Sequence, residues 1–312
     1  MISIVIPLYN KEEYVLNTLQ SVFNQFFQSY EIVIVNDGST DRSLELIKTI
    51  QDERIRIITQ ENQGVSAARN RGIREATYDY IALLDADDEW QPDYLSTQIE
   101  LIQTYPHCAV FACAYNFKYP HGIRPMILNK MPFTENTGIL HNYFEVASCS
   151  NPPICSSTVA FKKEAILSVG GFPVGIASGE DLIVWAKLAC YYPIAYSTKP
   201  SAIFVLNHSH LVTNPPVRSH DVTDYIANEL ISLYQQASGK QKKDIKAYIS
   251  MWYKMRASMY MRKYDKKQTL RYSLYALKYN ALNWKVYFFM IIICLPNRLQ
   301  KVIRNKYENK LR

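Results

Sequence analysis

Residues 81–88 read Ile-Ala-Leu-Leu-Asp-Ala-Asp-Asp, an apolar run that leads directly into a group of carboxylates. An uninterrupted apolar run bounded by polar residues is typical of a buried central strand in a parallel sheet. Such a strand carries Asp85 and Asp87 to the carboxyl edge of the sheet, where open α/β folds bind ligands. Like charges held together need compensation, which a hard divalent cation shared with a phosphate can supply. The alternative is a solvated acidic turn, and this motif alone does not decide between the two.

The segments around this strand alternate between strand and helix patterns. Apolar runs predict strands at residues 2–8, 31–35, 55–59 and 80–85. Apolar residues at helical spacing predict helices over residues 10–26, 41–50, 65–76 and 92–105. Asn10, with Glu13 three residues later, is expected to cap the first helix, and the run Ser39-Thr40-Asp41 the second. This order predicts a Rossmann-like, doubly wound and mostly parallel α/β sheet with right-handed crossovers.

Two changes of pattern along the chain predict its domains. Residues 116–155 contain five prolines, which break any long element and are typical of binding loops. After Pro215 and Pro216 the sequence changes to helical stretches rich in tyrosine and basic residues. We therefore expect one domain over residues 1–215, with halves at 1–115 and 116–215, and a basic helical C-terminal region over residues 216–312.

The charge of the chain is distributed unequally between these two parts. Residues 1–215 contain 15 Lys+Arg and 22 Asp+Glu, a net charge of −7. Residues 216–312 contain 20 Lys+Arg and 6 Asp+Glu, a net charge of +14, which gives +7 for the whole chain. This asymmetry predicts an anionic partner for the C-terminal region. No recognised nucleic-acid module is present, so we do not expect that partner to be nucleic acid.

Composition restricts the class of protein further. A hydrophobic content of 48% is globular, and no stretch reaches the ~18 apolar residues that a membrane-spanning helix needs. The chain begins as a strand without a charged segment or cleavage site, so no signal peptide is expected. The six cysteines form no C-x-x-C pair, which favours reduced thiols in a cytoplasmic protein.

One apolar run near the C-terminus has two interpretations. Residues 286–295 are ten consecutive apolar residues, about half a membrane span, and Pro296 ends the run. Trp284, Tyr287 and several basic residues accompany it, as in helices that lie at a membrane interface. We expect peripheral attachment to the inner, anionic face of the cell membrane. The alternative is that the run packs on the first domain or on a second subunit.

Four linked motifs at successive strand ends resemble those of the family 2 inverting glycosyltransferases. They are Ile6-Pro7-Leu8-Tyr9-Asn10, Val35-Asn36-Asp37-Gly38-Ser39-Thr40-Asp41, Asn62-Gln63-Gly64-Val65-Ser66-Ala67-Ala68-Arg69-Asn70 and Leu84-Asp85-Ala86-Asp87-Asp88. The resemblance covers roughly residues 1–210 and continues through Ser156-Ser157-Thr158, Gly170-Gly171-Phe172 and Gly179-Glu180-Asp181-Leu182. It implies a type A glycosyltransferase fold. No Q-x-x-R-W motif follows Asp181, so a non-processive enzyme is expected.

The resemblance implies a donor site for a nucleotide sugar, formed with Pro7 at the end of the first strand. Tyr9 would offer its ring to a pyrimidine, or else is a core tyrosine. Asp37 would accept from a ring N–H, although a turn-forming role beside Gly38 would look the same. Arg69 suits a base carbonyl or a phosphate. Its alternative is a surface arginine paired with Glu75 or Asp79.

The same resemblance assigns the carboxylates after the central strand. Asp85 would hold the ribose or assist the metal, and Asp87 would coordinate Mn²⁺ or Mg²⁺ on the diphosphate. Asp88 would support these two. Such sites use one or two carboxylates together with substrate phosphates, so a sparse protein contribution is expected.

The family analogy selects Asp181 as the general base. Neighbouring residues on a helix point about 100° apart, so only one of Glu180 and Asp181 can face the acceptor. Glu180 would bind an acceptor hydroxyl or hold the loop. The helix N-terminus is expected to favour the ionised carboxylate. Trp185 is interpreted as a core residue in preference to a sugar platform, and His208 or His210 is a weaker candidate for contact with the diphosphate.

The sequence is compatible with three functions. The leading one is transfer of a sugar from a nucleotide sugar, by family frequency a UDP-sugar, to a lipid-linked or cell-surface glycan. A nucleotidyltransferase shares the sheet and the carboxylates, but normally has a glycine-rich loop and a basic residue after the first strand, where this chain has Pro-Leu-Tyr-Asn. A non-catalytic glycan-binding protein is the third, and the intact carboxylate set argues against it.

Overall fold

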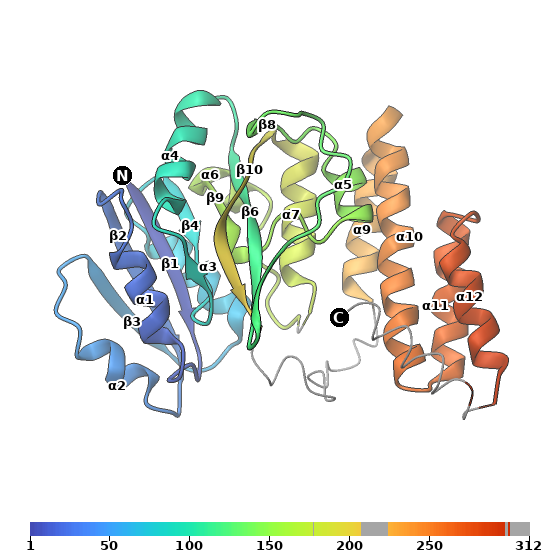
Figure 1. Cartoon of the computed structure of the whole chain (residues 1–312), viewed down its shortest axis with the longest axis horizontal. Coiled ribbons are helices and arrows are strands. Elements are labelled where there is room, and N and C mark those ends of the chain that lie inside the picture. The colour runs from blue at the N-terminus through green and yellow to red at the C-terminus, as the bar shows by residue number, and fades with distance from the viewer. Residues whose placement is uncertain (177, 207–223, 297–298, 300–312) are drawn as a thin grey trace. The chain divides into compact units, whose positions relative to one another are not determined.

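The computed structural model of the chain describes residues 1–176, 178–206, 224–296 and 299. It divides into two compact units, Met1–Ile226 and Ala227–Arg312 (Figure 1). The predicted domain boundary at 215/216 lies outside the described residues and stays a prediction. The boundary predicted between the halves, at 115/116, falls inside one continuous strand, β6 (Val110–Tyr119).

The first unit is built on a ten-stranded sheet of order β3-β2-β1-β4-β9-β6-β10-β5, with β7 paired to β6 and β8 to β10. Its strands are β1 (Ile2–Leu8), β2 (Tyr30–Asp37), β3 (Ile55–Gln60), β4 (Tyr80–Leu83), β5 (Glu89–Trp90), β6, β7 (Gly122–Pro125), β8 (Thr137–Ile139), β9 (Val159–Lys162) and β10 (Ile194–Val205). The strands β1 to β4 are parallel, with Ile4 opposite Ile32 on one side and Ala82 on the other. The predicted doubly wound sheet is confirmed.

The acceptor half of the sheet is mixed. β9 is antiparallel to both of its neighbours, β4 and β6, whereas β10 is parallel to β6. The sequence did not predict this arrangement, because β9 has only four residues and so short a strand carries little periodicity.

The helices of the first unit connect and flank these strands (Figure 1). They are α1 (Val15–Phe23), α2 (Ser43–Lys48), α3 (Val65–Glu75), α4 (Tyr94–Thr104), α5 (Tyr143–Cys149), α6 (Lys163–Ser168) and α7 (Glu180–Tyr191), with a 3₁₀ turn η1 (Ser156–Thr158). A methyl group added to Gly72 of α3 would collide with Val5 of β1, so this glycine lets the helix approach the sheet closely.

The predicted cap of the first helix is wrong. The helix α1 begins at Val15, and Asn10 has a left-handed φ of 51° in the loop before it. The Asn10 side chain instead accepts a hydrogen bond from the backbone N–H of Thr40, at 2.8 Å. Asparagine tolerates the left-handed region and bonds to nearby backbone, so it ties the loops after β1 and β2 together. The predicted cap of the second helix is also wrong, because Arg42 occupies the N-cap position of α2 and no side chain caps the helix. Asp41 instead accepts from the N–H of Ser43 at 2.9 Å, one residue before the cap position.

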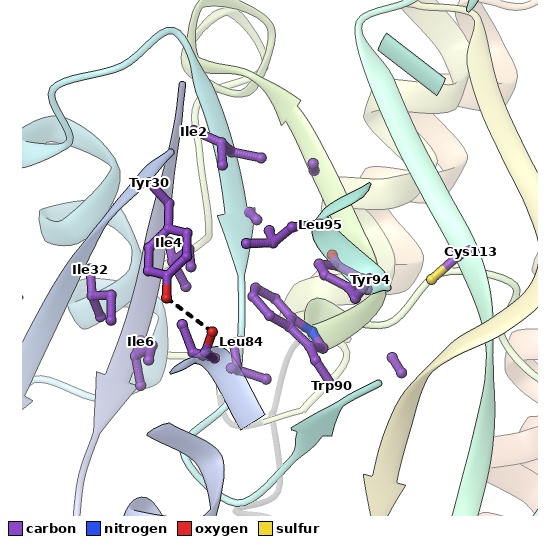
Figure 2. Packing of buried hydrophobic residues seen from close by; sticks show 14 of the residues in the cluster. Ile2, Ile4, Ile6, Tyr30, Ile32, Leu84, Trp90, Tyr94, Leu95 and Cys113 are labelled. Carbon is purple, nitrogen blue, oxygen red and sulfur yellow. Dashed lines mark hydrogen bonds between the residues drawn. The ribbon is translucent and has the colours of Figure 1, made fainter. Parts of the chain in front are cut away.

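The hydrophobic core lies around β1, whose residues are all buried. Trp90 and Tyr94 stack in this core with ring centroids 4.0 Å apart, and both side chains are buried. The hydroxyl of Tyr30 donates to the carbonyl of Val22, which satisfies a polar group inside the apolar cluster (Figure 2). The ends of β1 and β4 are therefore held rigidly, and the loops that follow them form the site.

The second unit is helical, as predicted. Its elements are α9 (Tyr225–Gln236), α10 (Gly239–Arg262), α11 (Lys266–Tyr279) and α12 (Trp284–Cys294). Tyrosine rings join these helices; Tyr260 of α10 stacks on Tyr272 of α11 at 5.3 Å. Asp265 caps α11 by accepting from the N–H of Gln268 at 2.9 Å. Among the described residues, no helix combines the length and the apolar character needed to cross a membrane.

Candidate active site

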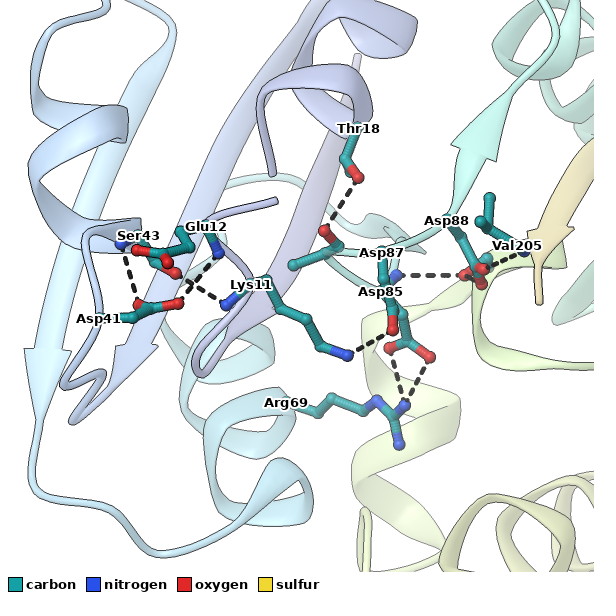
Figure 3. A network of polar contacts seen from close by, with 12 residues as sticks. Lys11, Glu12, Thr18, Asp41, Ser43, Arg69, Asp85, Asp87, Asp88 and Val205 are labelled. Atoms are coloured by element: carbon teal, nitrogen blue, oxygen red, sulfur yellow. Dashed lines mark hydrogen bonds and ion pairs between the residues drawn. The ribbon is translucent and has the colours of Figure 1, made fainter. Parts of the chain in front are cut away.

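The carboxylates of residues 85–88 follow β4 and lie beside the loop after β1 (Figure 3). The turn is fixed from two sides. The hydroxyl of Thr18 in α1 donates to the carbonyl of Ala86 at 3.0 Å, and the N–H of Asp85 donates to the hydroxyl of Ser157 at 3.1 Å. Hydrogen bonds therefore hold the backbone of this acidic turn in place, and the alternative of a solvated acidic turn is wrong.

Asp85 pairs with the buried Arg69 of α3. The Nη2 of Arg69 donates to both carboxylate oxygens of Asp85, at 2.8 and 3.0 Å, and its Nη1 lies 3.4 Å from Glu180. Burial alone would lower the pKa of Arg69, but the charges of Asp85 and Glu180 outweigh burial and raise it. The predicted alternative of a surface arginine paired with Glu75 or Asp79 is wrong.

Asp87 forms an ion pair with Lys11, which reaches it from the loop after β1 (Figure 3). The Asp87 side chain is 16% exposed, so part of it reaches solvent. Lys11 supplies the compensating charge that a carboxylate cluster requires. The sequence interpretation missed this residue, although its place next to Asn10 in the first strand-end motif was a usable signal.

Asp88 is buried and does not face the ligand edge. Its carboxylate accepts from the hydroxyl of Ser157 at 2.5 Å and from the N–H of Val205 at 3.0 Å. Burial, reinforced by Asp87 and Asp85, raises the pKa of Asp88 well above its ordinary value. Asp88 thus joins the acidic turn to η1 and to the end of β10. These contacts agree with its predicted role of supporting Asp85 and Asp87.

Asp37 is also held by its own chain. Its carboxylate accepts from the Gln60 side chain at 2.8 Å and from the N–H groups of Gln63 at 3.0 Å and Gly64 at 2.8 Å. Gly64 has a φ of 89°, a conformation that favours glycine. The Asp37 carboxylate can accept about four hydrogen bonds, and three of these positions are used. The carboxylate shapes the loop before α3, and one position stays for a ring N–H.

The two remaining donor-side residues differ in exposure. Tyr9 directly follows β1 and is 46% exposed, so the alternative of a core tyrosine is wrong. Pro7 is buried in β1, opposite Val35 of β2. Its contribution to a donor site is therefore to fix the strand end from which Tyr9 projects.

The second pair of carboxylates begins α7. Gly179, with a φ of 84°, precedes Glu180 and Asp181. Glu180 faces Arg69, while an oxygen of Asp181 accepts from the N–H of Leu182 at 2.8 Å. Arg69 thus lies between Asp85 and Glu180, which are far apart in the sequence.

The carboxyl groups of both residues hold their protons more tightly than usual. Burial raises the pKa of Asp181, and Arg69 offsets this only in part. Burial also raises the pKa of Glu180, and the neighbouring Asp181 adds to the shift. The expectation that the helix N-terminus would dominate at Asp181 is wrong, because desolvation has the larger effect here.

A clamp between α3 and the loop before α7 fixes this geometry. The side chain of Asn70 donates to the carbonyl of Phe172 at 2.7 Å and accepts from its N–H at 2.8 Å. The guanidinium of Arg69 lies over the Phe172 ring, 5.2 Å from its centroid. The motifs at Arg69-Asn70 and Gly170-Gly171-Phe172 therefore contact each other and together fix the position of Arg69.

The carboxylates fit a divalent cation that arrives with a phosphate. A magnesium-type ion needs only one or two carboxylates when phosphate oxygens complete its shell, and Asp87 with Asp85 offers that donor set. Within residues 1–176, 178–206, 224–296 and 299, no three His, Cys, Asp or Glu side chains gather as a closed metal cage.

The remaining candidate residues are Trp185 and two histidines. Trp185 is fully buried and packs edge-on against Phe172 at 5.7 Å, so it is a core residue as interpreted. His208 and His210 lie outside the described residues, and their contact with a diphosphate stays a prediction.

A parallel α/β edge that carries these carboxylates, with a buried arginine between them, defines the class of fold as type A glycosyltransferase. A solved structure of TarS from S. aureus in complex with UDP-GlcNAc superimposes with a TM-score of 0.60 and 15% identity, over 90% of this chain and 92% of that chain. The mannosyltransferase PcManGT from Pyrobaculum calidifontis, in complex with GDP-Man and Mn²⁺, gives a TM-score of 0.54 and 20% identity, over 90% and 75%. These likenesses confirm the fold.

Residues 3–166 match glycosyl transferase family 2, and the chain belongs to that family. Glycosyltransferase GlyA of Streptococcus pneumoniae is 32% identical over 186 residues, which cover 58% of this chain and 27% of GlyA. The chain spans about a third of the length of the curated relatives that it matches first, including 32% of an uncharacterized glycosyltransferase of Rickettsia bellii. The family match decides against the nucleotidyltransferase alternative.

Proposed function

We propose that the protein is a non-processive, inverting glycosyltransferase that moves a sugar from a nucleotide sugar to a hydroxyl of a glycan. One observation carries the proposal. Arg69 bridges Asp85, in the turn assigned to the donor, and Glu180, the neighbour of the proposed base. Arg69 therefore joins the donor turn, which also carries Asp87, to the start of α7, which also carries the proposed base Asp181.

The donor would bind along the ends of β1, β2 and β4. Tyr9 would offer its exposed ring face to the base, and the remaining acceptor position of Asp37 would receive a ring N–H. A UDP-sugar is the proposed donor, supported by the UDP-GlcNAc bound to TarS. The GDP-Man bound to PcManGT makes a guanosine donor the main competitor.

Asp87, assisted by Asp85, would hold Mn²⁺ or Mg²⁺ against the diphosphate. When bound, the cation supplies Lewis-acid neutralisation of the charge on the leaving nucleoside diphosphate. Lys11 would release Asp87 as the donor arrives and lie near the phosphates, because its flexible side chain already reaches this carboxylate.

Asp181 would act on the acceptor as the general base. Its carboxylate removes the proton of the acceptor hydroxyl while that oxygen forms a bond to the anomeric carbon. The bond from this carbon to the diphosphate oxygen breaks on the opposite side, and the nucleoside diphosphate leaves with the electron pair. One displacement inverts the anomeric configuration. Glu180 would hold Arg69 and orient the acceptor.

The acceptor proposed is a lipid-linked or cell-surface glycan, handled at the cytoplasmic face of the cell membrane. It follows from the resemblance to polysaccharide-building members of the family and from the basic second unit. A single transfer per encounter is proposed because the Q-x-x-R-W motif is absent after Asp181.

A donor screen tests this function. Thermal unfolding is measured with UDP-, GDP- and dTDP-sugars, each with and without Mn²⁺, since a ligand that binds the native state raises its stability. We expect one nucleotide class to raise the melting temperature in Mn²⁺ and to be slowly hydrolysed without acceptor. The Asp87→Ala variant, used as control, should lose the Mn²⁺-dependent part of the shift. No shift with any nucleotide sugar would overturn the proposal.

A further inference from the structure

The outer side of α12 carries an apolar face that none of the described residues of the second unit covers. Trp284, Tyr287 and Ile291 lie at spacings of three and four residues, so they share one side of the helix. Their side chains are 68%, 46% and 61% exposed. The opposite side of α12, with Val286 and Phe289, is buried. A helix that is apolar on all sides normally has a partner on each of them.

The neighbouring helix adds leucines to this exposed surface. Leu270 and Leu274 of α11 lie one turn apart and are 41% and 53% exposed. α11 and α12 pack on each other and both pack on α10. Leu270 and Leu274 therefore lie on the exposed side of α11, away from these contacts. We call the surface formed by Leu270, Leu274, Trp284, Tyr287 and Ile291 the outer face.

The segment that carries the outer face is rich in basic residues. Residues 263–295 contain a single acidic residue, Asp265, whose carboxylate already caps α11. The same segment contains six basic residues: Lys263, Lys266, Lys267, Arg271, Lys278 and Lys285. Within the residues that the structure describes, none of these six pairs with a carboxylate. The apolar outer face thus belongs to a segment with a strong excess of positive charge.

We propose that the outer face docks on an anionic lipid bilayer, with α12 lying in the plane of the interface. Charge complementarity selects this occupant, because basic residues in the same segment as an apolar stripe match anionic headgroups above acyl chains. Trp284 and Tyr287 have the amphipathic rings that settle at headgroup level. Lys285 lies over the Trp284 ring at 5.8 Å, so its charge sits at the edge of the stripe.

The full chain allows a site-specific test, because only one of its four tryptophans is exposed. Trp90, Trp185 and Trp252 are buried, so a fluorescence change on vesicle binding reports on Trp284. The chain is mixed with phosphatidylcholine vesicles with and without phosphatidylglycerol, and with vesicles whose acyl chains are brominated. We expect binding only to anionic vesicles, weakened by salt, with a blue shift of Trp284 and quenching by bromine. Trp284→Phe should bind but lose the signal.

Two sets of substitutions distinguish vesicle binding by the outer face from non-specific binding by any exposed apolar residue. The triple variant Trp284→Ser, Tyr287→Ser, Ile291→Ser should bind anionic vesicles at least roughly tenfold more weakly. The charge variant Lys267→Glu, Arg271→Glu, Lys278→Glu should bind on the order of 100-fold more weakly. A matched control, Phe26→Ser, Ile127→Ser, Val174→Ser, removes equally exposed side chains from the first unit and should bind like the wild type.

Three results would overturn the docking proposal while leaving the proposed transfer reaction standing. They are equal binding to neutral and anionic vesicles, no binding to either, and unchanged vesicle binding by the triple variant. If the triple variant instead alters the sedimentation coefficient of the protein, the outer face is a contact between copies of the chain.

Discussion

The turn at residues 85–88 and the turn at residues 180–181 both gather carboxylates, but they treat negative charge in opposite ways. In the first turn the ligand-facing groups have cationic partners, Arg69 for Asp85 and Lys11 for Asp87. In the second turn, burial raises the pKa of both carboxyls and Arg69 offsets it only partly. The first turn is built to keep charge, and the second to accept a proton.

This difference explains how one sheet edge can serve two chemical steps. A carboxylate that holds a cation against a leaving diphosphate must stay ionised and anchored. A general base must take up a proton near the working pH, which a raised carboxyl pKa favours. The single arginine between the turns keeps them together while contacting only one carboxylate directly in each.

Asp181→Asn should abolish transfer and leave donor binding intact. The amide keeps the shape of the side chain but cannot accept the proton, and the loss of a general base costs roughly 10²–10⁴-fold in rate. Transfer is measured by release of nucleoside diphosphate and donor affinity by calorimetry. Glu180→Gln, the matched control, should lose much less activity. If the two variants lose activity equally, the choice of Asp181 is wrong.

Asp87→Ala should reduce transfer by about 10²–10³-fold, since it removes a charge clamp that acts in the transition state. Unlike Asp181→Asn, it should also weaken Mn²⁺-dependent donor binding. Titration of Mn²⁺ followed by electron paramagnetic resonance measures this directly. Lys11→Met should change Mn²⁺ affinity only a few-fold, because the pair is partly exposed. Full activity of Asp87→Ala at limiting Mn²⁺ would contradict the assignment.

The pH dependence of transfer should show a single acidic limb set by the second turn. Asp181 acts as a base only when ionised, so kcat/KM should fall tenfold per unit as pH drops below its pKa. Because burial raises that pKa, the limb should begin at a higher pH than an ordinary aspartate would give. A rate profile that stays flat down to the ordinary carboxyl range would show that the raised pKa is not used.

Asp88, the buried carboxyl of the first turn, should affect the free energy of unfolding. Its pKa is raised, so the native state binds this proton more tightly than the unfolded chain, and stability falls as pH rises from the ordinary to the raised value. Asp88→Asn can keep both bonds, donating to Ser157 and accepting from Val205, and should change the unfolding free energy little. Asp88→Ala should lose about 1–3 kcal/mol by urea unfolding. Equal losses would mean that Asp88 is held as a charged group.

The sequence predicted the frame of the molecule better than the contacts inside its site. Alternating strand and helix patterns placed β1 to β4 correctly because each is a local apolar run. The contact of Arg69 with Glu180 spans 111 residues, and no local pattern encodes it. Lys11 was missed for the same reason, since its partner Asp87 is 76 residues away. Only the assembled sheet brings these charges together.

The configuration of the product tests the central claim most directly. In the proposed mechanism one turn holds the leaving group and the other supplies a single base, so sugar transfer should occur in one displacement. Proton NMR of the product from a donor of known configuration, recorded early in the reaction, reads the coupling at the anomeric carbon. We predict a product with the configuration opposite to that of the donor. Retention of the donor configuration would contradict the division of roles between the two turns.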